Sequence, residues 1–362
     1  MIGKRYKEDF NYPILGVTLI IIVMGVLTIK SATASQETSF YLRQIVWALA
    51  GFVAMATVLV IDYSSLDRWA YVILGINLVF LVIVEFAGVT AGGSRRWINF
   101  SFFSFQPSEL LKPLSVLIVA WWMVRHSEAW TRRQDSIPKL FTLAGILLVP
   151  LAMVLKEPDF GTSFLVLCVS MLLVFLGGAP RWIFAVAVPA LGAVGAAFVW
   201  FEPYRRARVL SFLNPAADPL GKGHQALQSL IALGNGGLAG VGLGGSMQKL
   251  HYLPEAHTDF IYAVIAEEAG LIGTVAVLAL YVGIIWRGYR IARRVGDGYL
   301  KLCAMGFMLL LVAQALMNMS VVLSLAPNKG IPLPFISFGP NSLIASLICL
   351  GLLLSISKDV SA

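Results

Sequence analysis

Charged side chains are scarce in this chain of 362 residues. Only 13% of the residues are Asp, Glu, Lys or Arg, and 58% are hydrophobic, whereas about a quarter of an ordinary soluble domain is charged. Cysteine is scarce too: Cys168, Cys303 and Cys349 each lie inside an apolar stretch. Their number is odd and their spacing matches no metal motif, so we expect packing residues rather than a disulfide framework or a zinc site.

Apolar runs, in contrast, recur along the whole chain at about the 20 residues that cross a bilayer. These runs are continuous, which excludes the alternating pattern of a membrane β-barrel. The sequence predicts an all-α polytopic membrane protein, a single domain over 1–362, with ten transmembrane helices. The expected spans are 13–30, 43–62, 69–89, 109–125, 138–155, 162–178, 182–202, 259–286, 300–325 and 341–357.

Basic residues give the orientation, and they explain the net charge of +8 without a nucleic-acid partner. They gather before the first span and in the loops that follow the fourth and eighth spans. An even number of spans separates these groups, so all lie on one side, which the positive-inside rule makes the cytoplasm. Both termini are then cytoplasmic and the long loop 203–258 faces outward. The residues are Lys4, Arg5, Lys7, Arg125, Arg132, Arg133, Lys139, Arg287, Arg290, Arg293, Arg294 and Lys301.

The outward segments also carry basic residues, against that rule. Together with nearby acidic residues they predict a polar cavity that accepts anions and opens to the outside. The basic residues are Arg95, Arg96, Lys112, Lys156, Arg205, Arg206, Arg208, Lys222, Lys249 and Lys329.

Within the outward loop, residues 225–233 form a short apolar-periodic stretch, and seven glycines follow between 234 and 245. The stretch is too short to span, so we expect short half-helices at the membrane surface. A G-x-G-x-x-G pattern begins at Gly240, but it lacks the strand and helix of a nucleotide fold. The glycines instead predict tight turns and close approach of the backbone to another segment.

The stretch LPEAHTDFIYAVIAEEAG, residues 253–270, puts ionisable groups at the mouth of an apolar helix. Asp259 has Glu255 and His257 beside it. Asp259, or Thr258 before it, could cap the helix. Asp259 could also act as a general base toward a hydroxyl nucleophile, or bind a metal.

Glu267 and Glu268 follow inside the same apolar stretch, ~12–14 Å along the axis of a continuous helix. Ionisable groups at such depth are costly and face a polar interior. We favour a buried structural pair bonded to neighbouring helices over a catalytic role.

Four more polar residues stand at the outer ends of spans. Glu109 and Lys112 share a helix face, and they either pair with each other or bind a phosphate. Trp97 belongs either to the interfacial aromatic belt or stacks on a sugar ring. Asp159, in the sequence EPD, could join Glu109 and Asp259 around Mg²⁺ or Mn²⁺, since oxygen ligands suit these ions.

Several stretches together resemble the SEDS proteins (shape, elongation, division and sporulation), and the resemblance covers nearly the whole chain. The sequence GGSMQKLHYLPEAHTDF favours the division and sporulation branch, and KGIPLPF leans slightly toward elongation. The family usually reads Tyr-Gly-Gly-Ser-Ser where this chain has FGPNS, Phe338 to Ser342. The matching stretches are GGSRRWINF, FQPSELLK, EPDFGTS, FLNPAADPLGKGHQALQSLIALGNGGL, GLGGSMQKLHYLPEAHTDFIYAVIAEEAGLIG and KGIPLPFISFG.

The resemblance implies a peptidoglycan glycosyltransferase that polymerises lipid II at the outer face of a bacterial cytoplasmic membrane, during division or elongation. Asp259 matches the family's essential aspartate and would be the general base. Mg²⁺ or Mn²⁺, held by Asp159 and Asp259, would stabilise the leaving pyrophosphate. The implied partners are a class B penicillin-binding protein with transpeptidase activity and other division or elongation proteins. Residues expected to bind substrate are Trp97, Arg96, Glu109, Lys112, Asp159, Lys249, His257 and Lys329.

Two other functions fit many spans with buried carboxylates. A lipid II flippase or transporter would place polar residues through the bilayer to both faces, whereas here they gather outside. A non-enzymatic division scaffold would tolerate loss of the Asp259 carboxylate.

Overall fold

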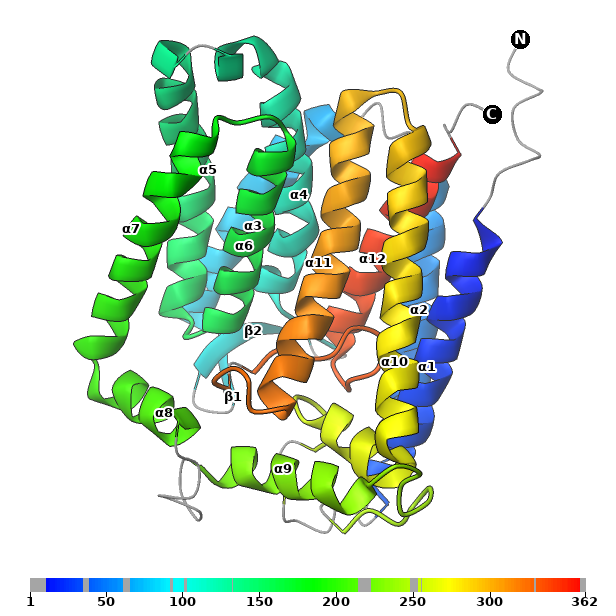
Figure 1. Cartoon of the computed structure of the whole chain (residues 1–362). Helices are drawn as coiled ribbons and strands as arrows, with labels where there is room; N and C mark the ends of the chain where they lie inside the picture. Colours follow the sequence, from blue (N-terminus) through cyan, green and yellow to red (C-terminus); the bar gives the residue numbers. More distant parts are fainter. Residues whose placement is uncertain are drawn as a thin grey trace.

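The computed structural model describes residues 11–34, 39–60, 66–91, 94–100, 103–131, 133–213, 223–247, 253–254, 256–328 and 330–358. The structure is a bundle of long helices that run between two ends (Figure 1). The bundle helices are α1 (Tyr12–Ala32), α2 (Phe40–Val60), α3 (Leu66–Ala87), α4 (Pro107–Arg125), α5 (Arg133–Lys156), α6 (Phe160–Leu176), α7 (Arg181–Trp200), α10 (Ile261–Arg294), α11 (Gly298–Val322) and α12 (Pro340–Ser357). This arrangement confirms the predicted polytopic α-helical membrane protein.

Every predicted span overlaps one of these helices. Among the described residues, eight helices are long and apolar enough to cross a membrane. Two apolar helices are shorter, Phe160–Leu176 and Arg181–Ala197. The count of ten transmembrane helices therefore stays a prediction, carried by the eight long helices and the two short ones.

The two ends of the bundle differ in character (Figure 1). At one end lie the first residue of α1, the last of α12, and the connections α4–α5 and α10–α11. At the other end lie the short helices α8 (Pro203–Leu213) and α9 (His224–Gly236), together with the strands. The half-helices expected in the loop 203–258 are thus confirmed. We call this second end, which the basic residues predict to be outside the cell, the outer end.

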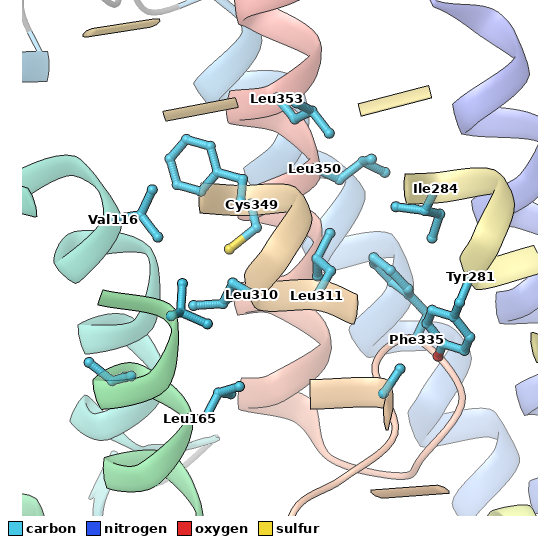
Figure 2. Packing of buried hydrophobic residues seen from close by; sticks show 14 of the residues in the cluster. Val116, Leu165, Tyr281, Ile284, Leu310, Leu311, Phe335, Cys349, Leu350 and Leu353 are labelled. Carbon is cyan, nitrogen blue, oxygen red and sulfur yellow. The ribbon is translucent and has the colours of Figure 1, made fainter. Parts of the chain in front are cut away.

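The core of the bundle is formed by α4, α11 and α12, whose apolar side chains are mostly buried. Figure 2 shows Val116 from α4 and Leu310 from α11 packed near Cys349 from α12. The cysteines carry free thiols, and Cys303 and Cys349 are buried, as expected of packing residues. The outer helices α1, α2 and α3 instead leave apolar side chains exposed, which fits lipid as their surroundings.

A small antiparallel sheet stands at the outer end, where the sequence had not predicted strands. It contains β1 (Val89–Ala91), β2 (Ser94–Phe100) and β3 (Phe103–Phe105) in that order. Trp97 of β2 lies opposite Val89. The strands connect α3 to α4 and place Arg96 and Trp97 over the bundle.

Helix α10 is not continuous, and this corrects the predicted span 259–286. Gly270 has a non-helical conformation, with φ 63° and ψ −159°. The residues before it, 261–269, form a short helix that lies across the outer end near α9, while the rest of α10 runs along the bundle (Figure 1). Glu267 and Glu268 therefore lie at a helix break, not deep within a transmembrane helix.

Candidate functional site

Asp259 lies in the turn that leads into α10. The N-cap residue of this helix is Phe260, whose own side chain makes no capping hydrogen bond. The interpretation of Asp259 or Thr258 as the N-cap is therefore wrong. The Asp259 side chain is half-buried, and its Oδ2 atom would lie 3.4 Å from a Cβ placed on Gly330. The carboxylate thus faces the segment between α11 and α12.

Main-chain hydrogen bonds fix the turn that carries Asp259. Asn318 Nδ2, on α11, donates to the carbonyl oxygen of Asp259 at 2.7 Å. Ser337 Oγ donates to the carbonyl oxygen of Thr258 at 2.6 Å, and the Phe338 amide donates to that of His257 at 2.9 Å. All three bonds are made to main-chain carbonyl oxygens of residues 257–259, so they fix the backbone of this turn.

The His257 ring packs against two aromatic side chains, which also contact each other. Its centroid lies 4.8 Å from that of Phe40 and 5.9 Å from that of Phe338. These contacts tie the turn to the start of α2. The predicted contact between His257 and substrate stays a prediction.

Glu109 and Lys112 form a buried ion pair at the start of α4. Lys112 Nζ lies 2.7 Å from Glu109 Oε1 and 2.8 Å from Oε2, and both residues are at most 5% exposed. Lys112 also donates to Gln314 Oε1 at 3.1 Å. Gln314 in turn donates to the Pro332 carbonyl at 2.9 Å and to Ser342 Oγ at 3.2 Å. The predicted ion pair is confirmed, and it joins α4, α11 and the start of α12.

Arg96 and Asp159 meet at the turn between α5 and α6. Arg96 Nε donates to the Glu157 carbonyl at 2.9 Å, and its terminal nitrogen to the Pro158 carbonyl at 2.7 Å. Asp159 Oδ1 accepts from the Thr162 amide at 3.1 Å and so caps α6. Asp159 Oδ2 lies 3.3 Å from Ser108 Oγ, which ties this turn to the start of α4.

The side chain of Glu157 is buried in the same turn. Neither carboxyl oxygen has a hydrogen-bond partner in the part of the chain that the structure describes. Burial, helped by the nearby charge of Asp159, raises the pKa of Glu157 to about 8, although Arg96 opposes the shift. Glu157 is therefore mostly protonated at neutral pH. Sequence reasoning noted Glu157 in EPD but gave it no role.

The start of α12 joins these groups. Asn341 Oδ1 accepts from the Gln106 amide at 3.2 Å, and Asn341 Nδ2 donates to the Ser104 carbonyl at 2.8 Å. Pro340 is the first residue of α12, a position where proline fits because its missing N–H would have no helical partner. The FGPNS sequence, unusual for the family it resembles, thus still starts a helix that faces the site.

The side chains at the outer end can be compared with the ligands that a divalent cation needs. Among the described residues, no three His, Cys, Asp or Glu side chains come together. Mg²⁺, however, often takes only one or two carboxylates and completes its shell with water and substrate phosphates. The unpartnered Glu157 oxygens beside Asp159 fit such a partial site, because a cation bound there would favour the ionised carboxylate and displace the Glu157 proton. That Asp159 and Asp259 hold the ion stays a prediction.

Of the remaining predicted substrate-binding residues, the structure describes one and not the others. Trp97 is half-buried in β2. Lys249 and Lys329, like Glu255, lie outside the described residues. Sequence reasoning missed Gln314, Asn318 and Ser337; the first two were visible as amides within an apolar stretch.

Comparisons with known proteins agree along the whole chain. The FtsW/RodA/SpoVE family, described as "Cell cycle protein", matches residues 11–362. A probable peptidoglycan glycosyltransferase FtsW of Geobacter sulfurreducens is 38% identical, covering 98% of each chain. Stage V sporulation protein E of Bacillus subtilis is 36% identical, covering 99% of each.

Two solved structures are similar as well. One belongs to a peptidoglycan synthase complex that coordinates polymerization and crosslinking; it has a TM-score of 0.81 and 28% identity, and covers 97% of this chain and 98% of its own. The other is the rod shape determining protein RodA of Thermus thermophilus, with a TM-score of 0.71, 24% identity and coverage of 98% of each chain. The likeness to RodA concerns the fold alone.

Proposed function

The chain belongs to the FtsW/RodA/SpoVE family of cell cycle proteins, and from this premise we propose that it is a peptidoglycan glycosyltransferase that polymerises lipid II. Its full-length similarity to proteins named as such transferases supports the activity. The observation that carries the proposal for the site is the place of Asp259. Its half-buried carboxylate stands at the outer end, on a turn held by backbone hydrogen bonds.

In the proposed reaction, the growing glycan on its lipid pyrophosphate is the donor and the sugar 4-hydroxyl of a new lipid II is the acceptor. Asp259 takes the proton of this hydroxyl, while the hydroxyl oxygen forms a bond to the donor sugar. The bond from that sugar to pyrophosphate breaks, and the pyrophosphate leaves with the electron pair. A carboxylate on a turn whose main chain is fixed by hydrogen bonds is suited to proton removal, because its position is set before substrate binds.

Negative charge grows on the leaving pyrophosphate, so donors should face it. We assign this task to basic residues of the outer end, among them Arg96 and Lys112 of the buried ion pair. A bound Mg²⁺ or Mn²⁺ would neutralise the same charge. Asp159 and Asp259 are the carboxylates proposed to hold that ion.

The protein is a multi-pass membrane protein. We propose that it lies in the cytoplasmic membrane with both termini inside. Arg125 and Arg287 to Arg294 stand at the end of the bundle where α1 begins and α12 ends (Figure 1), and basic residues favour the cytoplasmic side. The site then faces outward, where lipid II is consumed. The likeness to a synthase complex supports a transpeptidase of the class B penicillin-binding proteins as partner.

A polymerisation assay tests the function. The chain would be copurified with its cognate penicillin-binding protein and given lipid II with Mn²⁺ or Mg²⁺, and the products separated on a gel. The variant Asp259→Asn removes the base while keeping the shape of the side chain. Its control is Asp297→Asn, which changes an aspartate at the opposite end of the bundle.

We expect a ladder of polymers from the wild type and from Asp297→Asn, and none from a folded Asp259→Asn complex. A ladder from Asp259→Asn would exclude Asp259 as the base while keeping the enzyme. If the intact wild-type complex gives no polymer, a flippase or a scaffold becomes the better explanation. Transport of fluorescent lipid II across vesicles would then decide between these two.

A further inference from the structure

The break in α10 is filled by another part of the chain. An unbroken helix would pair the amides of residues 271 and 272 with the carbonyls of residues 267 and 268. Here the Leu271 amide donates to Gly237 O at 2.9 Å and the Ile272 amide to Leu238 O at 3.2 Å.

The two carbonyls that the break releases are also satisfied. Glu267 O accepts from the Val241 amide at 3.0 Å, and Glu268 O accepts from the Gly242 amide at 3.1 Å. Two helical hydrogen bonds are thus replaced by four bonds to residues 237–242. Because buried backbone groups without partners are costly, this segment is what allows the helix to break here.

Close approach of two backbones explains the glycines at the crossing. A Cβ on Gly240 would lie 2.1 Å from the carbonyl oxygen of Glu268, and a Cβ on Gly270 would lie 2.4 Å from the Gly240 nitrogen. Both residues also have positive φ, 81° and 63°. No other residue type fits these two places without moving the chains apart.

The carboxylates of Glu267 and Glu268 secure the same crossing from two sides. Glu267 accepts hydrogen bonds from Ser246 Oγ and from Asn235 Nδ2, the latter at 3.2 Å. Glu268 accepts from Ser31 Oγ near the end of α1. Both residues are at most 3% exposed, so their bonds are shielded from water.

We propose that Glu267 and Glu268, together with the glycine segment 236–245, are a clamp that sets the direction of the short helix 261–269 and thereby positions Asp259. Glu267 and Glu268 are positioning residues, not catalytic ones. The short helix is held at one end by this clamp and at the other by Asn318 and Ser337. Residues 261–268 between them are all buried. The helix therefore acts as a rigid arm, and a shift at the clamp moves the carboxylate. The inference rests on the proposed function for its kinetic consequence only.

Gly240→Ala tests the clamp, because it pushes the glycine segment away from Glu268. The control is Gly178→Ala: Gly178 also has positive φ, 92°, but a Cβ there meets nothing within 4 Å, and it lies in the loop between α6 and α7. Both variants place alanine at a positive φ, 81° and 92°, and only the first opens the crossing. A second pair, Glu268→Ala and Glu268→Gln, removes or keeps an acceptor for Ser31.

Two readouts are needed, measured on the full chain in nanodiscs with its penicillin-binding protein. Amide hydrogen exchange should rise across 257–270 in Gly240→Ala and Glu268→Ala, and stay at the wild-type level in Gly178→Ala and Glu268→Gln. In lipid II polymerisation, kcat should fall about tenfold or more in the first two, with KM within about twofold, because a displaced base slows the chemical step more than binding.

Equal exchange at 257–270 in Gly240→Ala and Gly178→Ala would overturn the clamp. Raised exchange with unchanged kcat would overturn its link to Asp259. If the wild type makes no polymer, the proposed function fails, and the exchange data still decide whether the clamp exists. If Gly240→Ala does not fold, the Glu268 pair carries the test.

Discussion

Asn318 donates one hydrogen bond to the main-chain carbonyl of Asp259 and another to that of Ile331, each at 2.7 Å. A single buried amide on α11 thus holds the turn before α10 against the segment that precedes α12. Asp259 Oδ2 faces Gly330, next to Ile331 in the chain. Asn318 therefore sets the distance between the proposed base, Asp259, and the segment at Gly330 and Ile331 that it faces.

Replacing Asn318 with alanine should weaken both stability and activity. The carbonyls of Asp259 and Ile331 would lose their donor, at a cost of about 1–3 kcal/mol for each buried group left unpaired. We expect a lower free energy of unfolding and a lower rate of lipid II polymerisation. Denaturant unfolding and the gel assay measure the two effects. Ser320→Ala is the control, since its hydroxyl bonds only within α11, to the Leu316 carbonyl, on an exposed face. Equal effects from both variants would contradict the special place of Asn318.

Variants of the ion pair between Glu109 and Lys112 can separate its effect on stability from its effect on polymerisation. Lys112→Met leaves Glu109 buried without its counter-charge and should cost about 3–5 kcal/mol of stability. The double variant Glu109→Gln with Lys112→Met removes both charges, so it should recover most of that stability. The recovery is expected because a buried ion pair adds little to stability over a neutral pair. We expect polymerisation to stay low in the double variant, because Lys112 is one of the residues proposed to meet the pyrophosphate. Recovery of polymerisation along with stability would show a purely structural pair.

The membrane-spanning helices could be predicted from the sequence because lipid demands long apolar runs, and such runs need no knowledge of the neighbours. The break at Gly270 could not be predicted in this way. The residues on both sides of Gly270 favour a helix, and the segment that replaces the lost bonds lies about thirty residues earlier, at 237–242. Only tertiary structure brings the two together.

The residues of the site also divide into those that the sequence reveals and those that only the tertiary structure reveals. Asp259, Asp159, Glu109 and Lys112 could be found because charged groups beside apolar helices demand a reason. Asn318 was harder to find, since its partners are main-chain atoms, which the side-chain sequence does not reveal. The strand that carries Trp97 was missed because β2 has only seven residues between two helices.

Glu157 should make stability depend on pH. Its pKa rises from the ordinary 4.5 to about 8 in the folded chain, so between these values the folded state keeps a proton that the unfolded chain has lost. Stability attributable to this group is full below pH 4.5, falls as pH rises, and is lost above about pH 8.

Glu157→Gln cannot ionise, so it removes this dependence. We expect its Tm to match that of the wild type at pH 4.5 and to exceed it above pH 8. Scanning calorimetry across this range makes the comparison. Glu202→Gln, a change at an exposed position, is the control and should follow the wild type throughout. A Glu157→Gln curve parallel to the wild type would show that the carboxyl is not buried in solution.

Asp159 caps α6 and is also a proposed cation ligand, and one substitution separates these roles. Asparagine is as good an N-cap as aspartate, so Asp159→Asn should keep the hydrogen bond to the Thr162 amide. Asp159→Ala loses the cap and should cost about 1 kcal/mol. Asparagine gives up only the longer contacts of Oδ2, such as the one with Ser108 Oγ at 3.3 Å, so we expect Asp159→Asn to unfold nearly like the wild type. A neutral amide is, however, a much weaker ligand for Mg²⁺ or Mn²⁺. Polymerisation by Asp159→Asn should therefore be slower and need more Mn²⁺.

Asp297→Asn is the matched control, because Asp297 caps α11 in the same way, accepting from the Leu300 amide at 3.0 Å, at the other end of the bundle. It should leave both the unfolding and the Mn²⁺ dependence of polymerisation unchanged. If Asp159→Asn behaves like Asp297→Asn in a titration of polymerisation rate against Mn²⁺, the Asp159 carboxylate serves only to start its helix. The cation would then have to be held elsewhere at the outer end.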